Sequence, residues 1–300
     1  MTPFEAEQSS REKRTRPVSI CGIGGWSACA LVLLCGCLAT GRKSVHLPER
    51  HTLKSEQLVV LSDFKLPKDH PLLGDLATLR SQESESLGLE FNGDDVKIYL
   101  FRDEMEYHKY LQTAHPGLPS RRAYFISSKD ELAVYTYWGE RIQEDLRHEY
   151  THGLLHSALL EVPLWFDEGL AEYFEVIGPK AGTINPEYAE RLSKAIQNGW
   201  EPDIARLESL EKVDQMQRAD YREAWAWVHF MLHHTPDTRQ VLLTYLSELK
   251  TNRKPEELSV RLKRELPEYK SRFLSYVSTL RLQHAGDGRR PQVASTSSGG

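Results

Sequence analysis

The segment His148-Glu149-Tyr150-Thr151-His152 is followed, after a short gap, by Pro163-Leu164-Trp165-Phe166-Asp167-Glu168-Gly169-Leu170-Ala171-Glu172-Tyr173. Residues 139–160 contain no proline and carry apolar side chains at helical intervals, so they predict a helix that includes the H-E-x-x-H pentad. Residues four apart on a helix lie on one face, with Cβ atoms about 5–6 Å apart. His148 and His152 can therefore reach one metal ion at the usual zinc–nitrogen distance of about 2.0–2.1 Å.

A catalytic zinc ion takes three protein ligands and keeps one open position for water. His156 is a poor third ligand, because eight residues of straight helix place it roughly 12 Å from His148. The pattern H-E-x-x-H-x-x-G-x-x-H is also absent, since Leu155 and Ala158 occupy its glycine and last histidine positions. Glu168 remains, on a second, returning helix that Pro163 would open. We therefore predict Zn²⁺ held by His148, His152 and Glu168.

Two further glutamates have expected roles around this ion. Glu149 follows the first ligand but points in another direction, so it can take a proton from metal-bound water without occupying the metal. Glu172 lies one turn beyond Glu168 on the same helix face. We expect it to accept the second ring N–H of a ligating histidine, which would fix the orientation of that ring.

The pentad, taken together with the W-F-D-E-G-L-A-E-Y-F sequence of residues 165–174, resembles the gluzincin zinc metallopeptidases. Within them it is most similar to the small peptidase-MA-like families that are often found on bacterial envelope proteins, and the resemblance covers roughly residues 58–282. It implies hydrolysis of peptide bonds, with His148, His152 and Glu168 as zinc ligands, Glu149 as the general base and Glu172 as an outer carboxylate. The G-x-M-E-N strand that holds a substrate amine is missing, so aminopeptidase specificity is not implied.

A segment further along the chain, Tyr221-Arg222-Glu223-Ala224, resembles the Y-x-x-G/A segment of the aminopeptidase branch. That resemblance implies that Tyr221 stabilises the oxyanion of the tetrahedral intermediate. A tyrosine buried on an amphipathic helix is an equal alternative. His233 or His234 could assist Tyr221, or could be an ordinary helix histidine.

The first 37 residues have the organisation of a targeting signal. Four basic residues between positions 11 and 16 precede the apolar run Ile20–Leu34, and Leu34-Cys35-Gly36-Cys37 resembles the lipobox of bacterial lipoproteins. We therefore expect lipidation of Cys37 and a lipid-anchored protein of the bacterial cell envelope. Leu38, rather than aspartate, favours the outer membrane where one exists. An uncleaved membrane anchor is the alternative, although the apolar run is short for a span of about 20 residues.

The remaining composition excludes several other classes of site. All four cysteines (positions 21, 29, 35 and 37) lie in the signal, so the processed chain can form no internal disulfide and has no thiolate zinc ligand. The formal net charge of −5 gives no indication of nucleic-acid binding. Residues 38–57 are expected to be a polar tether, residues 58–282 the metallopeptidase domain and residues 283–300 a disordered tail.

The order of the expected elements predicts an α+β fold. A small mixed sheet forms an N-terminal lobe, an all-helical C-terminal lobe follows, and the metal site lies between them, in the zincin-like arrangement that the resemblance implies. The expected strands are residues 58–62, 96–101, 123–126 and 132–137. Helices are expected at residues 71–87, 104–113, 139–160 and from Pro163 onward, and then at about 187–198, 203–211, 221–234, 237–249, 255–264 and 267–282.

The strand at residues 132–137 immediately precedes the metal helix, so we expect it to be the edge of the sheet beside the cleft. There Leu132, Ala133, Val134 and Tyr135 could pair with an extended peptide and hold its scissile carbonyl over the metal. The alternative is a plain hairpin strand packed on the core.

These features together predict a zinc-dependent metallopeptidase of the bacterial cell envelope that acts on a peptide or protein substrate. Two alternatives remain open. The chain could be a catalytically silent zinc-fold lipoprotein that serves as a binding or assembly module, or an amide hydrolase that acts on cell-wall peptides. The identity of the substrate and the oligomeric state do not follow from the sequence.

Overall fold

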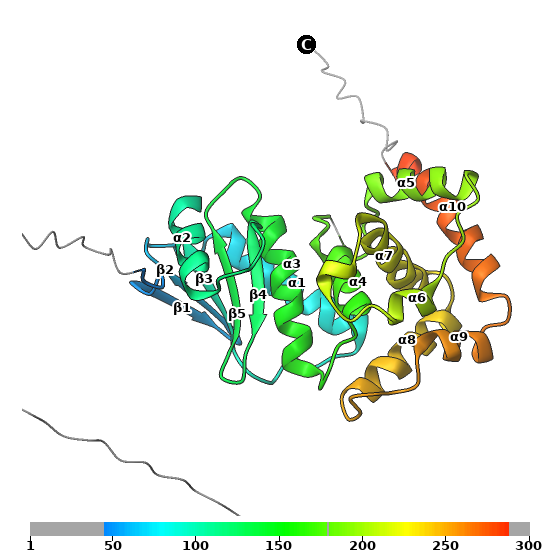
Figure 1. The fold of residues 1–300 in the computed structure, drawn as a ribbon, viewed down its shortest axis with the longest axis horizontal. Coiled ribbons are helices and arrows are strands. Elements are labelled where there is room, and N and C mark those ends of the chain that lie inside the picture. The colour runs from blue at the N-terminus through cyan, green and yellow to red at the C-terminus, as the bar shows by residue number, and fades with distance from the viewer. Residues whose placement is uncertain (1–44, 179, 288–300) are drawn as a thin grey trace, which may run out of the picture. The chain divides into compact units, whose positions relative to one another are not determined.

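A computed structural model describes residues 45–178 and 180–287 (Figure 1), with backbone alone for residues 281–287. The expected signal, including Cys37, lies outside the described residues. Among the helices that are described, none combines the length and apolar character needed to cross a bilayer.

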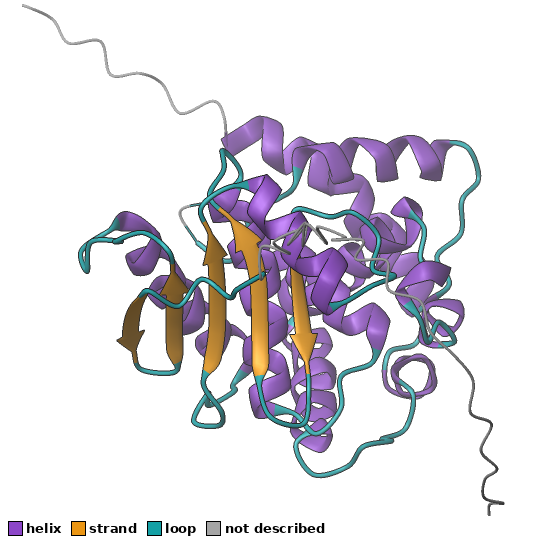
Figure 2. Ribbon diagram, turned by 60° about the vertical axis from the view of Figure 1, so that its left-hand side comes forward, coloured by secondary structure: helices purple, strands orange, loops and turns teal. Residues whose placement is uncertain are grey.

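A five-stranded mixed sheet occupies the N-terminal part of the described chain (Figure 2). Its spatial order is β1-β2-β3-β5-β4, in which β2, β3 and β5 are parallel and the two outer strands are antiparallel to their neighbours. The strands are β1 (His51–Ser55), β2 (Leu58–Ser62), β3 (Val96–Phe101), β4 (Ala123–Ser127) and β5 (Leu132–Tyr137).

Alternation along the central strands gives the sheet two apolar faces, because successive side chains of a strand point to opposite sides. On β3, Ile98 and Leu100 face α1 (Pro71–Leu87) and α3 (Ile142–Ala158), whereas Tyr99 and Phe101 face α2 (Glu104–Ala114). The large core therefore lies on the side of the sheet that carries α3.

The helices from α3 onward form the rest of the structure, in which α4 packs between α3 and α7 (Figure 1). A mixed sheet followed by helices is consistent with the expected α+β class. The elements after α3 are α4 (Leu164–Glu175), α5 (Pro186–Gln197), α6 (Ile204–Glu208), a short 3-10 helix (Val213–Gln215), α7 (Arg218–His233), α8 (Pro236–Leu249), α9 (Leu258–Glu265) and α10 (Tyr269–Asp287).

Two glycines allow α3 and α4 to approach their neighbours closely. A Cβ atom on Gly153 would lie 2.5 Å from Cγ1 of Val96, so α3 can rest against β3 only with glycine there. A Cβ atom on Gly169 would lie 2.9 Å from the backbone of Ala224, so α4 can approach α7 only in the same way. Both glycines directly follow a predicted zinc ligand. The close packing of α3 on β3 and of α4 on α7 therefore determines where the histidines and Glu168 lie.

Three expectations about chain organisation are corrected. The strand at Leu132–Tyr137 is not an edge, because β3 pairs with one side of it and β4 with the other; Leu132, Ala133, Val134 and Tyr135 therefore have no free backbone edge. Residues 51–55, expected in the tether, form β1, since β2 offers them a free side to pair with. Residues 283–287, expected in the tail, continue α10.

Candidate metal centre

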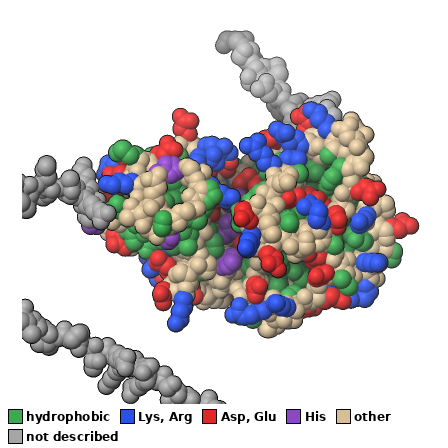
Figure 3. Space-filling model, in the orientation of Figure 1, with side chains coloured by type: hydrophobic (Ala, Val, Ile, Leu, Met, Phe, Trp, Pro, Cys, Tyr) green, Lys and Arg blue, Asp and Glu red, His purple; other side chains and the backbone are tan. Residues whose placement is uncertain are grey.

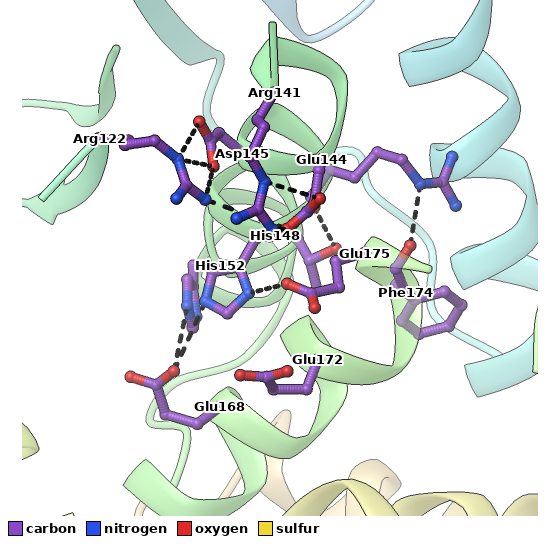
Figure 4. A network of polar contacts seen from close by, with 12 residues as sticks. Arg122, Arg141, Glu144, Asp145, His148, His152, Glu168, Glu172, Phe174 and Glu175 are labelled. Atoms are coloured by element: carbon purple, nitrogen blue, oxygen red, sulfur yellow. Dashed lines mark hydrogen bonds and ion pairs between the residues drawn. The ribbon is translucent and has the colours of Figure 1, made fainter. Parts of the chain in front are cut away.

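The two histidines of the pentad lie on the same face of α3, with ring centroids 5.0 Å apart. Opposite them, α4 runs antiparallel to α3. His148, the earlier of the two on α3, meets Glu175 at the end of α4 (Figure 4), whereas His152, one turn later, meets Asp167 near the start of α4. This antiparallel pairing brings the middle of α4, where Glu168 lies, to the space between the two rings.

One oxygen of Glu168 faces the Nε2 atoms of both histidines. Oε2 lies 3.6 Å from Nε2 of His148 and 3.9 Å from Nε2 of His152. One potential ligand atom from each of the three residues lies within 4.8 Å of the other two. Ligand atoms on a tetrahedral zinc ion at about 2.0–2.1 Å are about 3.3 Å apart, so the two distances from Glu168 exceed that separation by only a few tenths of an ångström.

Carboxylates also hold the outer ring nitrogens. Nδ1 of His148 hydrogen-bonds to Oε2 of Glu175 at 2.9 Å. Nδ1 of His152 lies 2.9 Å from Oδ1 of Asp167, although the angle departs from that of a well-formed hydrogen bond. A carboxylate thus lies beside each Nδ1, and with the ring proton held on that side the Nε2 lone pair of each ring would be available to a metal ion.

Glu172 does not accept a ring N–H, contrary to expectation. Its carboxylate receives the Tyr188 hydroxyl at 2.8 Å. Two turns of helix separate Glu168 from Glu175, so both side chains lie on the face that meets His148, and Glu175 takes the position expected for Glu172. Burial, followed by the charge of Glu175, raises the pKa of Glu172 to about 8.

The site concentrates negative charge around the two imidazoles. Burial alone would lower the pKa of His148, but Glu168 and Glu175 outweigh it and raise that pKa well above its usual value. In the same way, Asp167 and Glu168 outweigh burial and raise the pKa of His152 to about 9. The surroundings therefore favour a positive charge at the rings, which either a proton or a metal cation can supply.

Glu149 is held by the edge strand of the sheet. The backbone N–H of Phe125 on β4 donates to its Oε2 at 2.6 Å, and burial raises the pKa of its carboxyl group. Glu149 also lines a cavity of about 370 Å³ together with His148, His152 and Glu168. One carboxylate oxygen is thus fixed by β4, while the side chain stays beside the three predicted ligands.

Tyr221 lies in the first part of α7 and borders a neighbouring cavity of about 460 Å³ that His148 and Glu168 also line. Burial, followed by the charge of Glu168, raises the pKa of Tyr221, and the Arg121 guanidinium acts in the opposite direction. The structure therefore brings Tyr221 close to the predicted ligands.

The other histidines considered above have different surroundings. His156 hydrogen-bonds through Nε2 to Oδ2 of Asp167 at 3.0 Å, behind the ring of His152. His233 bonds to the Tyr173 hydroxyl at 2.7 Å and lines a separate cavity that contains none of the predicted ligands. The ring of His234 stacks on Phe230.

A second group in the described residues could also hold a metal ion. His148, Glu172 and Glu175 each offer one ligand atom within 4.8 Å of the others. This group uses a single imidazole and the carboxylate that already holds Nδ1 of His148. The first group is the better zinc site, because it retains two imidazoles with their outer carboxylates intact.

In the comparison with known proteins, one family model matches part of this chain, and its description gives no function. Residues 144–257 match the family described as "Protein of unknown function (DUF1570)". The matched segment includes His148, Glu149, His152, Glu168 and Tyr221, and it excludes the sheet. No curated protein matches the chain significantly.

Sequence reasoning missed four groups at the site: Asp167, Glu175, Arg121 and the backbone N–H of Phe125. Asp167 and Glu175 carried a usable signal, because they flank Glu168 on the same predicted helix at spacings that can face α3. Arg121 and Phe125 carried none. Their positions depend on β4 lying at the sheet edge beside α3, which is a tertiary feature.

Proposed function

We propose that this protein is a zinc-dependent metallopeptidase with a zincin-like fold and a gluzincin-type site, in which His148, His152 and Glu168 hold the metal. One observation supports the proposal most strongly: the Nε2 atoms of both histidines face the same Glu168 oxygen, while a carboxylate lies 2.9 Å from each Nδ1 atom. Two imidazoles and one carboxylate are a ligand set typical of catalytic zinc, and the outer carboxylates are typical of its surroundings.

Zinc at this position would polarise the scissile carbonyl and lower the pKa of a bound water. Glu149 serves as the general base, since its carboxylate lies in the same cavity and burial raises its pKa, which strengthens it as a proton acceptor. The attacking water oxygen forms a bond to the carbonyl carbon, Glu149 takes the water proton, and the carbon–nitrogen bond then breaks as Glu149 delivers that proton to the amine.

One side chain near Glu168 suits the oxyanion that forms during attack. Tyr221 is proposed as the hydrogen-bond donor, and the Arg121 guanidinium lies beside its hydroxyl. A donor aimed at developing negative charge stabilises the transition state more than the ground state.

The substrate is proposed to align along β4, which takes the role expected for the strand at residues 132–137. β4 lies at the edge of the sheet, packs against α3, and contributes Tyr124 and Phe125 to the cavity that contains Glu149. The N–H of Phe125 is already bonded to Glu149, so an extended peptide would pair with the remaining backbone groups of this edge.

The place of action is part of the same proposal. A lipid anchor on Cys37 would hold the domain in the bacterial cell envelope, at the outer membrane where one exists. Metabolic labelling with a fatty-acid analogue tests this, because Cys37→Ala should abolish incorporation if Cys37 is the acylated residue.

A peptide-library digest of the purified protein, with and without a zinc chelator, tests the peptidase proposal. We expect cleavage that requires zinc and that Glu149→Gln abolishes while the protein keeps its metal. Full activity of Glu149→Gln would contradict the role of Glu149. Bound zinc without cleavage of peptides or cell-wall fragments would favour a catalytically silent binding module, and cleavage of wall fragments alone would favour a cell-wall amide hydrolase.

A further inference from the structure

The cavity beside Tyr221 is rich in arginine. It has a volume of about 460 Å³ and adjoins the candidate metal centre, because His148 and Glu168 form part of its wall. Four guanidinium groups line it, from three separate parts of the chain: Arg121 before β4, Arg191 on α5, and Arg218 and Arg222 on α7. Figure 3 shows Lys and Arg side chains on both sides of the hollow in which histidines are visible.

Three of these guanidinium groups have no acidic partner among the residues that the structure describes. Arg191 pairs with Glu187 at 2.7 Å. Within the described part of the chain, no carboxylate lies within ion-pair distance of Arg121, Arg218 or Arg222. Arg222 donates to the backbone carbonyl of Arg218 at 3.0 Å, which leaves most of its donors free.

The neighbouring Arg122 explains why Arg121 lies in the cavity. Arg122 forms a two-pronged ion pair with Asp145 at the start of α3, with contacts of 2.6 and 3.0 Å (Figure 4). Arg121 lies instead over the ring of Tyr124 and beside the Tyr221 hydroxyl. The ion pair of Arg122 thus anchors the segment from which Arg121 reaches the site.

The acidic residues of the cavity are engaged elsewhere. Glu168 faces the two histidines, Glu172 accepts the Tyr188 hydroxyl and Glu187 pairs with Arg191. The three remaining guanidinium groups therefore present positive charge to whatever enters from the metal side.

The cavity on the other side of the predicted ligands is different in character. It has a volume of about 370 Å³, and apolar side chains form much of its wall: Leu118, Pro119, Phe125, Leu164 and Val213. Both cavities include Arg121, His148 and Glu168 in their walls, so one extended ligand over the metal centre could reach both.

We propose that the cavity lined by Arg121, Arg218 and Arg222 binds a carboxylate of the substrate close to the scissile bond, while the apolar cavity takes an apolar side chain on the other side of that bond. This inference rests on the proposed peptidase function and names its substrate class. The carboxylate belongs either to an Asp or Glu side chain or to a free C-terminus. Guanidinium groups bind carboxylates through paired, charge-assisted hydrogen bonds, so this contact would give specificity.

Three hexapeptides that contain Ala, Leu and one variable residue separate the two sources of carboxylate. The first has Gln and an amidated C-terminus, the second replaces Gln by Glu, and the third keeps Gln but has a free C-terminal carboxylate. Mass spectrometry first identifies the bond that is cleaved. Each peptide is then made in two versions, with the variable residue on the N-terminal or on the C-terminal side of that bond. We expect one carboxylate peptide to exceed the neutral peptide in kcat/KM by about tenfold or more.

Charge-changing variants test whether this cavity is responsible for the preference for a carboxylate peptide. In Arg218→Glu and in Arg222→Gln, the ratio of kcat/KM for the carboxylate peptide to that for the neutral peptide should fall several-fold. Arg253→Gln, which changes an exposed arginine outside both cavities, should keep the wild-type ratio. Efficient cleavage with a ratio near one in the wild type, or an unchanged ratio in both cavity variants, would overturn the proposal.

Binding distinguishes a failure of this inference from a failure of the peptidase proposal. Fluorescence anisotropy measures binding of the same three labelled peptides to the Glu149→Gln protein, whether or not any peptide is cleaved. Tighter binding of a carboxylate peptide that is lost in Glu149→Gln/Arg222→Gln would support the cavity assignment, even if no hydrolysis occurred. Equal binding of all three peptides would overturn it.

Discussion

Each of the two imidazoles lies between carboxylates, with one beside each of its ring nitrogens. His148 lies between Glu168 and Glu175, and His152 between Glu168 and Asp167. An outer carboxylate fixes the tautomer of the ring and increases the basicity of the nitrogen that faces the metal. At the scale of single residues, Asp167 and Glu175 are therefore as much a part of the candidate centre as its three predicted ligands.

Zinc affinity tests the assignment of the outer carboxylate. Glu175→Gln should weaken zinc binding by about 10- to 100-fold, because Nδ1 of His148 would lose its charged acceptor. Glu172→Gln is the matched comparison and should have a smaller effect, since Glu172 bonds to Tyr188 rather than to a ring. Competition with a chromophoric chelator measures both, and a larger loss in Glu172→Gln would contradict the assignment.

The role of Tyr221 can be separated from simple packing by kinetics. Tyr221→Phe removes only the hydroxyl and should lower kcat by about 10²–10³ if that hydroxyl supports the oxyanion. Thermal unfolding of the variant serves as the control for folding. An unchanged kcat would reduce Tyr221 to a packing residue of α7.

Glu83 is a buried carboxyl group behind the site, and its titration should make stability depend on pH. Burial raises its pKa to about 8, although it accepts the Thr151 hydroxyl at 2.7 Å. The folded protein thus keeps a proton that the unfolded chain releases near its ordinary pKa of about 4.3. This contribution to the free energy of unfolding is fully present below that pKa and is lost as the pH rises through about 8.

Denaturant unfolding between pH 5 and pH 8, with chelator present, measures this dependence. Glu83→Gln cannot ionise, so its free energy of unfolding should fall less over this range than that of the wild type. The difference should be on the order of a few kcal/mol. Glu85→Gln, an exposed change on the same helix, should follow the wild type. Equal pH dependence in Glu83→Gln and the wild type would contradict the burial argument.

At the scale of elements, α4 determines the site because it lies between α3, which carries the histidines, and α7, which carries Tyr221. Arg147 ties this arrangement together, since it donates to the backbone carbonyl of Phe174 and to Asp75 on α1, each at 3.0 Å. The position of Glu168 therefore depends on how closely α4 packs against both neighbouring helices.

Gly169→Ala should disturb this packing. Its methyl group would lie 2.9 Å from the backbone of Ala224, and forcing extra volume into a packed contact costs about 1–3 kcal/mol. Gly74→Ala on α1 is the matched control: no atom lies within 4 Å of its added Cβ, so it should stabilise the protein by about 0.5–1 kcal/mol. Urea unfolding measures both, and a Gly169→Ala protein as stable as the wild type would contradict the close α4–α7 contact.

Elements with strong local signals could be predicted from the sequence. The strand at Leu58–Ser62 and the helix at Pro71–Leu87 have the expected bounds, because a short apolar run and a proline at a helix start are local features. Strand order was not predictable in this way. β5 precedes α3 in the chain, yet β4 lies at the edge, since pairing partners are chosen by tertiary packing.

The residues of the candidate site were likewise predictable where local features place them and not where tertiary packing does. His148, His152 and Glu168 were predictable as neighbours because helix periodicity and one short turn bring them together. Glu172 was assigned by spacing within α4, and the assignment was wrong because the offset between α3 and α4 directs Glu175 to His148 instead. The arginine-lined cavity had no sequence signal, as its members come from three distant segments.

At the scale of the whole molecule, one unit, residues 44–300, contains all of the described residues and both cavities that adjoin the candidate centre. The sheet supplies the edge strand β4 and holds Glu149, while the helices supply Glu168, Tyr221 and two of the uncommitted arginines. The proposed chemistry therefore depends on the two parts being folded against each other, with one metal ion at their junction.

Anomalous diffraction, recorded on either side of the zinc absorption edge from crystals of the zinc-loaded protein, tests this most directly. We predict one peak, about 2.0–2.1 Å from Nε2 of His148 and Nε2 of His152 and in contact with the Glu168 carboxylate. A peak among His148, Glu172 and Glu175, or no peak at either group, would contradict the proposed centre.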